Sequence, residues 1–142
     1  CVYVDLDHFK SINDQYGHGA GDGVLREVSR RLRGIVRSAD VPARLGGEEF
    51  ALLLPQTEEA AAFDLSERVR AYVSAHPVEI AGIAEGIQIT ASFGVASVIP
   101  QRDAPDLEGY SSHLLDAADS ALMHAKQSGR NRVVAASSLS VL

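Results

Sequence analysis

Four carboxylates at two separate places in the chain are of the type that forms metal-binding sites. Asp5 and Asp7 close a short apolar run that begins at Cys1, and Glu48 and Glu49 directly follow a pair of glycines. Carboxylate oxygens are the ligands that Mg²⁺ prefers, and the bound ion usually keeps contact with substrate phosphates. Glu48 and Glu49 alone would be better interpreted as a solvated acidic pair. Together with Asp5 and Asp7, they indicate metal-assisted chemistry on a phosphate, in which bound ions activate a hydroxyl and stabilise the leaving oxygen.

Other motifs for binding metals or phosphates do not fit. An EF-hand loop requires Asp or Asn at the position of Phe9, and the glycine-rich stretch 17–23 contains neither G-x-G-x-x-G nor G-K-[ST]. No group of Cys and His residues has the spacing of a zinc site, and a single histidine such as His18 is more often structural.

Composition limits the class of protein. The 142 residues suit a single domain, and 46% hydrophobic with 23% charged residues is ordinary for a globular chain. No apolar run approaches the roughly 20 residues of a membrane helix, and the single cysteine excludes an internal disulfide, so we expect a cytoplasmic domain without membrane contact. The net charge of -6 argues against binding of a nucleic acid polymer, but not of a small phosphate ligand.

The apolar periodicities predict the order β-α-β-β-α-β, followed by a further helix and strand. Gly46-Gly47 is expected to form the tight turn of a hairpin, because glycine adopts the positive φ that such turns need. Strands are predicted at 1–4, up to 45, 49–54, 87–98 and 132–135, helices at 22–35, 58–76 and 113–128, and polar loops at 8–20 and 100–112.

This order predicts a ferredoxin-like α/β (α+β) fold of the palm type. Its βαββαβ core is an antiparallel sheet with both helices packed on one face, and an added helix and strand follow. The first strand would lie centrally beside the hairpin, with Asp5 near the Gly46-Gly47 turn. We expect one domain over 1–136 and a loosely ordered tail over 137–142.

Four motifs in the chain resemble those of the GGDEF family, the diguanylate cyclases. Residues 44–50, R-L-G-G-E-E-F, resemble the signature of this family in its GGEEF form. Residues 5–14 resemble its D-x-D-x-F-K-x-x-N-D segment, residues 17–22 its G-H-x-x-G-D, and residues 125–131 its A-K-x-x-G-R-N. The motifs occur in the order of the family and across most of the chain, so a chance match is very unlikely.

The resemblance implies a reaction in which two GTP molecules condense to cyclic di-GMP and two pyrophosphates. Each 3′-hydroxyl attacks the α-phosphate of the other GTP, so two domains would have to face each other as a homodimer. Asp5, Glu48 and Glu49 are the implied catalytic residues and, with the main-chain carbonyl of Leu6, the implied ligands of Mg²⁺, with Mn²⁺ as the alternative ion. One glutamate would also help deprotonate the 3′-hydroxyl, and which one stays open.

The resemblance also implies contacts to the nucleotide. Asn13 and Asp22 would bind guanine, since a carboxylate accepts from the N1–H and amino groups of the base. Asp7 would support the metal ligands rather than join them, and Phe9 is expected to pack as well. The implied contacts to the phosphates are Phe9, Lys10, Gly46, Gly47, Lys126 and Arg130. The alternative for Lys126 and Arg130 is that they are ordinary cations at a helix C-terminus.

A further R-x-x-D pattern resembles the inhibitory product site of the family. Arg37 can donate two hydrogen bonds to guanine and Asp40 can accept from it, while Arg68 would complete the site from a neighbouring domain. This pattern alone is weak evidence for a product site, but its spacing to Gly46 strengthens that interpretation.

Three alternatives to an active cyclase remain open. These are a catalytically inactive cyclic di-GMP receptor, a cyclase with another product, and a structural domain without ligand. Family members usually carry a further N-terminal stretch, so we expect that residues are missing before Cys1 and that the full-length protein has an upstream sensor or receiver domain and may be membrane-tethered.

Overall fold

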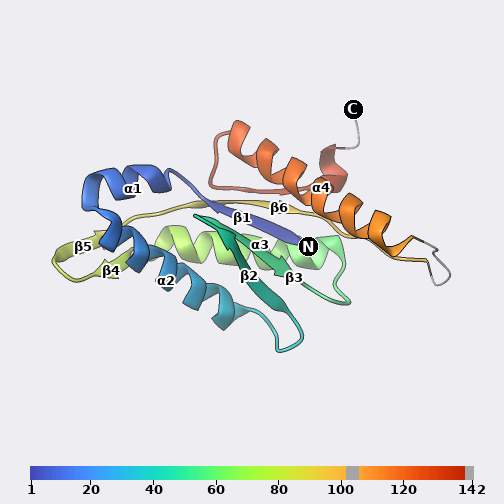
Figure 1. Ribbon diagram of the computed structural model, residues 1–142, viewed down its shortest axis with the longest axis horizontal. Helices are drawn as coiled ribbons and strands as arrows, with labels where there is room; N and C mark the ends of the chain where they lie inside the picture. The colour runs from blue at the N-terminus through green and yellow to red at the C-terminus, as the bar shows by residue number, and fades with distance from the viewer. Residues whose placement is uncertain (102–105, 140–142) are drawn as a thin grey trace.

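The computed structural model describes residues 1–101 and 106–139. Seven strands, four α-helices and one short 3-10 helix make up this part of the chain (Figure 1). In chain order they are β1 (Val2–Leu6), α1 (Phe9–Tyr16), α2 (His18–Ile35), β2 (Val41–Gly46), β3 (Glu49–Leu53), α3 (Glu59–Ala75), β4 (Val78–Ile80), β5 (Ile83–Ile87), β6 (Ala91–Val95), α4 (Leu107–Gln127), β7 (Val133–Ala135) and the 3-10 helix Ala136–Leu139.

A five-stranded sheet forms the centre of the molecule, in the order β2-β3-β1-β6-β7. The central strand β1 runs antiparallel to both β3 and β6, while β7 pairs with β6 in parallel. This arrangement confirms the predicted palm-like α/β fold with β1 beside the hairpin. Strands β4 and β5 form a separate small hairpin.

The alternation of side chains along β1 divides the molecule into two layers. Val2, Val4 and Leu6 are almost fully buried in the main core, which α2 and α3 cover from one face. Tyr3 points to the other face, where it packs beside Ala118 of α4. Figure 1 shows α4 on the opposite side of the sheet from α2 and α3.

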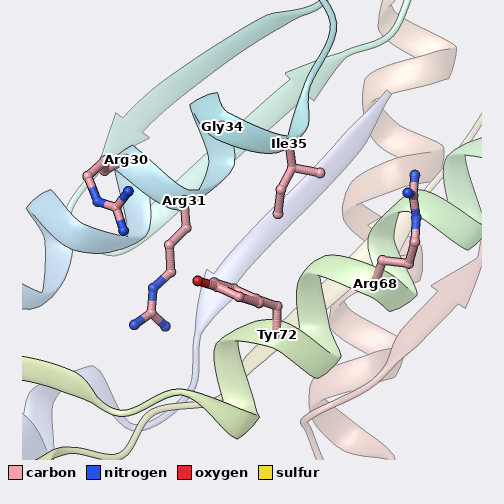
Figure 2. A pocket seen from close by; sticks show the side chains of 6 residues that line it. All are labelled: Arg30, Arg31, Gly34, Ile35, Arg68 and Tyr72. Atoms are coloured by element: carbon pink, nitrogen blue, oxygen red, sulfur yellow. The ribbon is translucent and has the colours of Figure 1, made fainter.

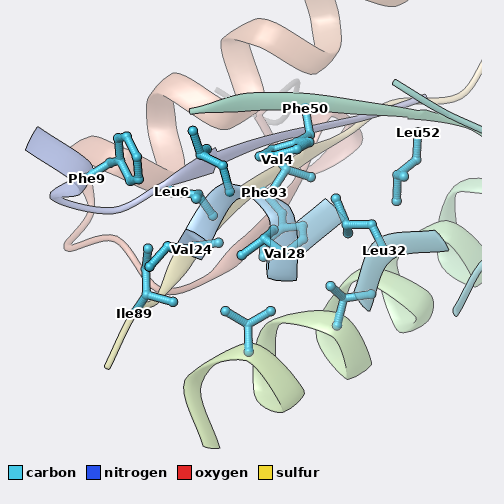
Figure 3. Close-up of a cluster of buried hydrophobic side chains, with 14 of the residues drawn as sticks. Val4, Leu6, Phe9, Val24, Val28, Leu32, Phe50, Leu52, Ile89 and Phe93 are labelled. Atoms are coloured by element: carbon cyan, nitrogen blue, oxygen red, sulfur yellow. The ribbon is translucent and has the colours of Figure 1, made fainter. Parts of the chain in front are cut away.

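The main core is built from β-branched and aromatic side chains of the sheet packed on one stripe of α2. Val24, Val28 and Leu32 recur at four-residue steps and meet Phe50 and Phe93 of the strands (Figure 3). On the other face, α4 lies so close to β6 that a Cβ atom at Gly94 would overlap the main chain at Ala118 and Leu122. The sheet therefore has a fixed position between its two helical layers.

Several predicted boundaries are wrong. The polar stretch 8–20 contains a helix, α1, which buries Phe9 and Ile12 and is separated from α2 by Gly17 at φ 86°. The strand predicted at 87–98 is two strands, since β5 ends at Ile87 and β6 begins at Ala91. Helix α4 begins inside the predicted loop 100–112, where Asp106 caps it by accepting a hydrogen bond from the Gly109 N–H at 2.7 Å.

The predicted tail is partly ordered. Residues 137–139 belong to the 3-10 helix, and the Ser137 hydroxyl donates to the Glu59 carboxylate on α3. Residues 102–105 of the predicted loop and residues 140–142 of the predicted tail lie outside the described residues. In the described part of the chain, no helix combines the length and the apolar character needed to cross a membrane.

Candidate active site at the end of β1

The end of β1 meets the acidic turn between β2 and β3, as the topology predicts. Asp5 lies opposite Glu49 in the antiparallel register of β1 and β3. The Leu6 N–H donates to the main-chain carbonyl of Glu48 at 3.2 Å. Asp5 is buried, Glu48 is half-buried and Glu49 is exposed. Backbone pairing therefore brings these residues of the predicted metal site together.

The turn itself lies one residue later than predicted. Gly46 ends β2 and pairs with Glu49, so that Gly47 and Glu48 form the tip. Gly46 and Gly47 have φ values of 148° and 49°, which side chains of L-residues disfavour. The Arg44 side chain donates through Nε to the Gly47 carbonyl at 3.0 Å, a contact that the sequence did not predict.

Among the residues that the structure describes, one cation forms an ion pair with the buried Asp5 carboxylate. Lys126 Nζ, in the last turn of α4, lies 2.6 Å from Asp5 Oδ2. Burial raises the pKa of Asp5 above 3.8, and the charges of Glu48 and Glu49 raise it further, while Lys126 opposes them. The buried Asp5 carboxylate is therefore stabilised by nearby positive charge. Lys126, close to the other end of the chain, supplies part of that charge.

The donor atoms suit a hard divalent cation in their chemistry. Asp5, Glu48, Glu49 and the Leu6 carbonyl offer only oxygen, and the mutual repulsion of the carboxylates is what a bound cation relieves. Among the described residues, however, no three His, Cys, Asp or Glu side chains are gathered closely enough to hold a metal in the present rotamers. Glu49 is exposed, so its side chain has room to turn toward Asp5.

The two predicted guanine-binding residues lie on neighbouring helices. Asn13 is half-buried on α1, and Asp22 is exposed in the first turns of α2. The Asn13 side chain lies directly over Gly21, so closely that a Cβ atom there would overlap its Oδ1. Gly21 therefore allows α1 and α2 to place Asn13 beside Asp22.

Three of the residues predicted to contact the phosphates lie at the start of α1 and just after α4. The Phe9 side chain is only 7% exposed and belongs to the core, as its predicted packing role requires. Lys10 is exposed in the first turn of α1, and Arg130 is exposed just after α4. Arg130 has a φ of 62° and donates its main-chain N–H to the Ala125 carbonyl at 3.0 Å.

The three residues of the R-x-x-D group line one cavity of about 220 Å³. Arg37 Nη2 lies 3.2 Å from Asp40 Oδ1 and donates to the Thr57 hydroxyl at 2.7 Å. Arg68 of α3 lines the same cavity in its own chain, and its predicted contribution to the site of a neighbouring domain stays a prediction. The pKa of Asp40 lies below 3.8, because side-chain and main-chain hydrogen bonds from Arg37 outweigh the opposing effect of burial.

A second cavity of about 320 Å³ adjoins this one between α2 and α3, and Ile35 and Arg68 line both. Figure 2 shows the Arg31 and Tyr72 side chains meeting across it. The Arg31 guanidinium lies 5.3 Å from the centre of the Tyr72 ring, at the distance of a cation–π contact. Arg31 also donates to the His76 carbonyl at 2.7 Å, which ties α2 to the end of α3.

Several contacting residues around the site were not predicted. Asp7 accepts hydrogen bonds from Thr90, Ser92 and the main-chain N–H of Asn131. Asn131 was part of a motif but was given no role. These partners are distant in sequence, so no local pattern could have indicated them.

Comparison with known proteins agrees with the fold and the motifs. The family model described as "Diguanylate cyclase, GGDEF domain" matches residues 1–132. Response regulator PleD of Caulobacter vibrioides is 42% identical over 134 residues, which cover 94% of this chain and 28% of PleD. The chain thus spans little more than a quarter of this relative.

Two solved structures are similar over nearly all of the chain. The GGDEF domain of DgcB from Caulobacter crescentus, in complex with c-di-GMP, has a TM-score of 0.84 at 35% identity, covering 96% of this chain and 76% of that chain. The active GGEEF domain of a diguanylate cyclase from Vibrio cholerae has a TM-score of 0.81 at 32% identity, covering 95% and 80%. These similarities confirm the family resemblance: the chain belongs to the GGDEF-domain family of diguanylate cyclases.

Proposed function

We propose that this domain is a diguanylate cyclase that condenses two GTP molecules into cyclic di-GMP and two pyrophosphates. The observation that carries the proposal is the pairing of Asp5 with Glu49 beside an intact Gly46-Gly47 turn. The related domain from Vibrio cholerae, described as active, is also of the GGEEF form. A domain that had lost catalysis would have no need to keep these carboxylates at one end of the central strand.

Asp5, Glu48, Glu49 and the Leu6 carbonyl are the residues that would hold Mg²⁺ or Mn²⁺. When bound, the ion supplies charge neutralisation at the phosphates and lowers the pKa of a coordinated hydroxyl. One of the two glutamates is then placed to accept the proton of the attacking 3′-hydroxyl. The exposed position of Glu49 suits this role, and the half-buried Glu48 suits a fixed ligand.

Three cations and the first turn of α1 would bind the triphosphate. Lys126 contacts Asp5, which is one of the proposed metal ligands. Its positive charge therefore lies where it would neutralise a phosphate bound to the same metal. Lys10 and Arg130 add two exposed positive charges, one from the first turn of α1 and one from the segment after α4. The N–H groups of Phe9 and Lys10 lie in the first turn of a helix and have no intrahelical partner, while Gly46 and Gly47 leave the turn open to the nucleotide.

Asn13 and Asp22 would select guanine. A carboxylate accepts from both the N1–H and the amino group of guanine, whereas adenine offers no such pair of donors. Asp22 is exposed, and Asn13 is held next to it above Gly21.

Catalysis would require a homodimer. One such site holds one GTP, and the reaction joins two, so each 3′-hydroxyl has to reach the α-phosphate held by a second copy. As each new bond to phosphorus forms, the bond to pyrophosphate breaks. An input domain elsewhere in the whole protein would control this encounter.

The cavity of Arg37, Asp40 and Arg68 would bind the product and inhibit the enzyme. Arg37 and Asp40 offer the donor and acceptor pattern that guanine requires, and the DgcB neighbour is a complex with c-di-GMP. Asp40 and Thr57 already hold the Arg37 guanidinium, so its orientation is largely set before a ligand binds.

Mass spectrometry of the products formed from GTP and Mg²⁺ tests the cyclase proposal. We expect cyclic di-GMP from the wild-type chain fused to a dimerising coiled coil, and a loss of product in Glu49→Ala. Cyclic di-GMP binding without turnover in the dimerised wild type would instead identify a receptor. Arg37→Ala is the matched control, since it should abolish binding at the product site and leave turnover intact.

A further inference from the structure

Asp7 is a buried carboxylate that accepts three hydrogen bonds from two different parts of the chain. Its side chain lies on the α4 face of the sheet, two residues beyond Asp5, and the residue is only 6% exposed. The hydroxyls of Thr90 and Ser92 donate to it at 2.7 Å each, and the main-chain N–H of Asn131 donates at 2.9 Å. The last contact joins β1 to the segment that follows α4.

We propose that Asp7 is a positioning residue that holds the segment 126–131 in the shape in which Lys126 and Arg130 bind the triphosphate. The proposal rests on the proposed function, and it adds a role for a residue that touches neither the nucleotide nor the metal. The backbone geometry of the segment and the hydrogen bonds at its end support this proposal.

The segment has a backbone shape that needs an external partner. Gly129, Arg130 and Asn131 have φ values of 114°, 62° and 43° in succession. Glycine adopts such values freely, but arginine and asparagine do so only at a cost in free energy. The Arg130 N–H closes the end of α4 on Ala125, and the Asn131 N–H is turned to Asp7. The contact to Asp7 therefore compensates for the strained turn that presents Arg130.

A second contact holds the same residue from the other helical layer. Arg70 of α3 donates through Nη1 to the Asn131 side-chain oxygen at 3.1 Å, and Glu67 in turn holds Arg70 at 3.0 Å. The main chain of Asn131 is thus held by Asp7, just after β1, and its side chain by Arg70 of α3. Lys126, at the start of the segment, is held by Asp5 of β1.

The three donors also argue against Asp7 as a direct metal ligand. Both of its oxygens are occupied, Oδ1 by Ser92 and Oδ2 by Thr90 and Asn131. The two hydroxyls can reverse their direction and accept, but a main-chain N–H can only donate. An acceptor at position 7 is therefore the feature that the Asn131 contact requires.

This requirement separates the isosteric substitution Asp7→Asn from the truncation Asp7→Ala. Asp7→Asn keeps an oxygen for the Asn131 N–H, because its amide N–H groups can face the reversible hydroxyl of Ser92. Asp7→Ala removes every acceptor. Ser92→Ala is the matched control, since it removes one hydrogen bond of Asp7 and leaves the contact to Asn131 in place.

The test compares the affinities for a non-hydrolysable GTP analogue and for GMP in Mg²⁺, by calorimetry, in the full chain. Asp7→Ala should weaken binding of the GTP analogue by roughly 10–100-fold, the usual effect of removing a residue that orients a functional group. Binding of GMP should change much less, because GMP lacks the β- and γ-phosphates of the triphosphate that the segment is proposed to bind. Asp7→Asn and Ser92→Ala should keep the wild-type ratio of the two affinities.

Amide hydrogen exchange provides a readout that does not depend on nucleotide binding. The Asn131 N–H should exchange faster in Asp7→Ala and at the wild-type rate in Asp7→Asn. A wild-type affinity ratio in Asp7→Ala, or an equal loss for both ligands, would overturn the positioning role. If the wild-type protein itself bound the GTP analogue no more tightly than GMP, the proposed function would fail instead.

Discussion

The Lys126 ammonium lies 2.6 Å from the Asp5 carboxylate, although the two residues are 121 positions apart in the chain. Asp5 belongs to the central strand and Lys126 to the last turn of α4, so the contact joins the two motifs that frame the sequence. It places the predicted metal ligands and the predicted phosphate-binding cations in one site.

Substitution of Lys126 by methionine should destabilise the protein. Lys126→Met keeps most of the side-chain volume but leaves the buried Asp5 carboxylate without its cation, which we expect to lower the free energy of unfolding by about 1–3 kcal/mol. Urea denaturation measures the change. The double variant Asp5→Asn/Lys126→Met should lose less than the two single variants added together. Full additivity would show that the two groups do not interact in solution.

The loss of stability in Lys126→Met should depend on pH in a defined direction. Burial raises the pKa of Asp5 above 3.8, and removal of Lys126 raises it further. A raised carboxyl pKa means that the folded state binds the proton more tightly than the unfolded state, so stability falls as pH rises from 3.8 through the folded pKa. The variant should therefore approach wild-type stability at low pH, and urea denaturation at several pH values would show whether the gap closes.

Asp40 should have the opposite effect on stability. Its pKa in the folded state lies below 3.8 because of Arg37, so its contribution is present above that value and is lost as pH falls through the folded pKa. Wild-type protein should therefore lose stability relative to Asp40→Asn as pH falls from about 5 through the folded pKa of Asp40. Parallel stability curves for the two proteins over this range would contradict the Arg37–Asp40 contact.

Gly21→Ala should weaken guanine nucleotide binding. The new methyl group would overlap the Asn13 side chain and displace it from its place beside Asp22. We expect a loss of GTP affinity between about tenfold and a hundredfold, as for other small displacements of binding groups. Gly19→Ala is the control, because a Cβ atom there meets nothing within 4 Å. Calorimetry with GTP measures both, and equal affinities would exclude a role for Asn13.

Gly94→Ala should separate α4 from the sheet. The added methyl group would meet main-chain atoms of Ala118 and Leu122, which cannot rotate away. We expect a loss of stability of about 3 kcal/mol, at the upper end for overpacking. Gly34→Ala, at an open position of α2, should be neutral or stabilising, since alanine favours helix by about 1 kcal/mol. Thermal unfolding compares the two variants, and equal melting temperatures would contradict the close packing of α4.

Patterns within short segments predicted the parts of the fold that depend on them. The apolar run 1–4, the helical repeat of α2 and the glycine pair at 46–47 are local, and each predicted its element. The order of the elements then predicted that Asp5 lies near the turn. Helix α1 was missed because it buries only Phe9 and Ile12, and because Gly17 ends it after eight residues.

Contacts between distant segments could not be predicted in the same way. Asn131 and Asp7 are 124 positions apart, and only the folded chain brings them together. Packing of α3 against α2 places Arg68 at the cavity of Arg37 and Asp40 in its own chain, while its predicted role toward another copy stays a prediction. The motifs therefore indicated which residues matter, and packing determined which of them meet.

The site's components leave the ribosome in the order of the chain, and β1 comes first. The carboxylates and the guanine-binding residues are synthesised before α3, whereas Lys126 lies in the last turn of α4 and Arg130 follows that helix. A nascent chain that stops short of α4 would carry the acidic cluster around Asp5 with no lysine to neutralise it. Completion of the charge balance around Asp5 is therefore one of the last events in the synthesis of this domain.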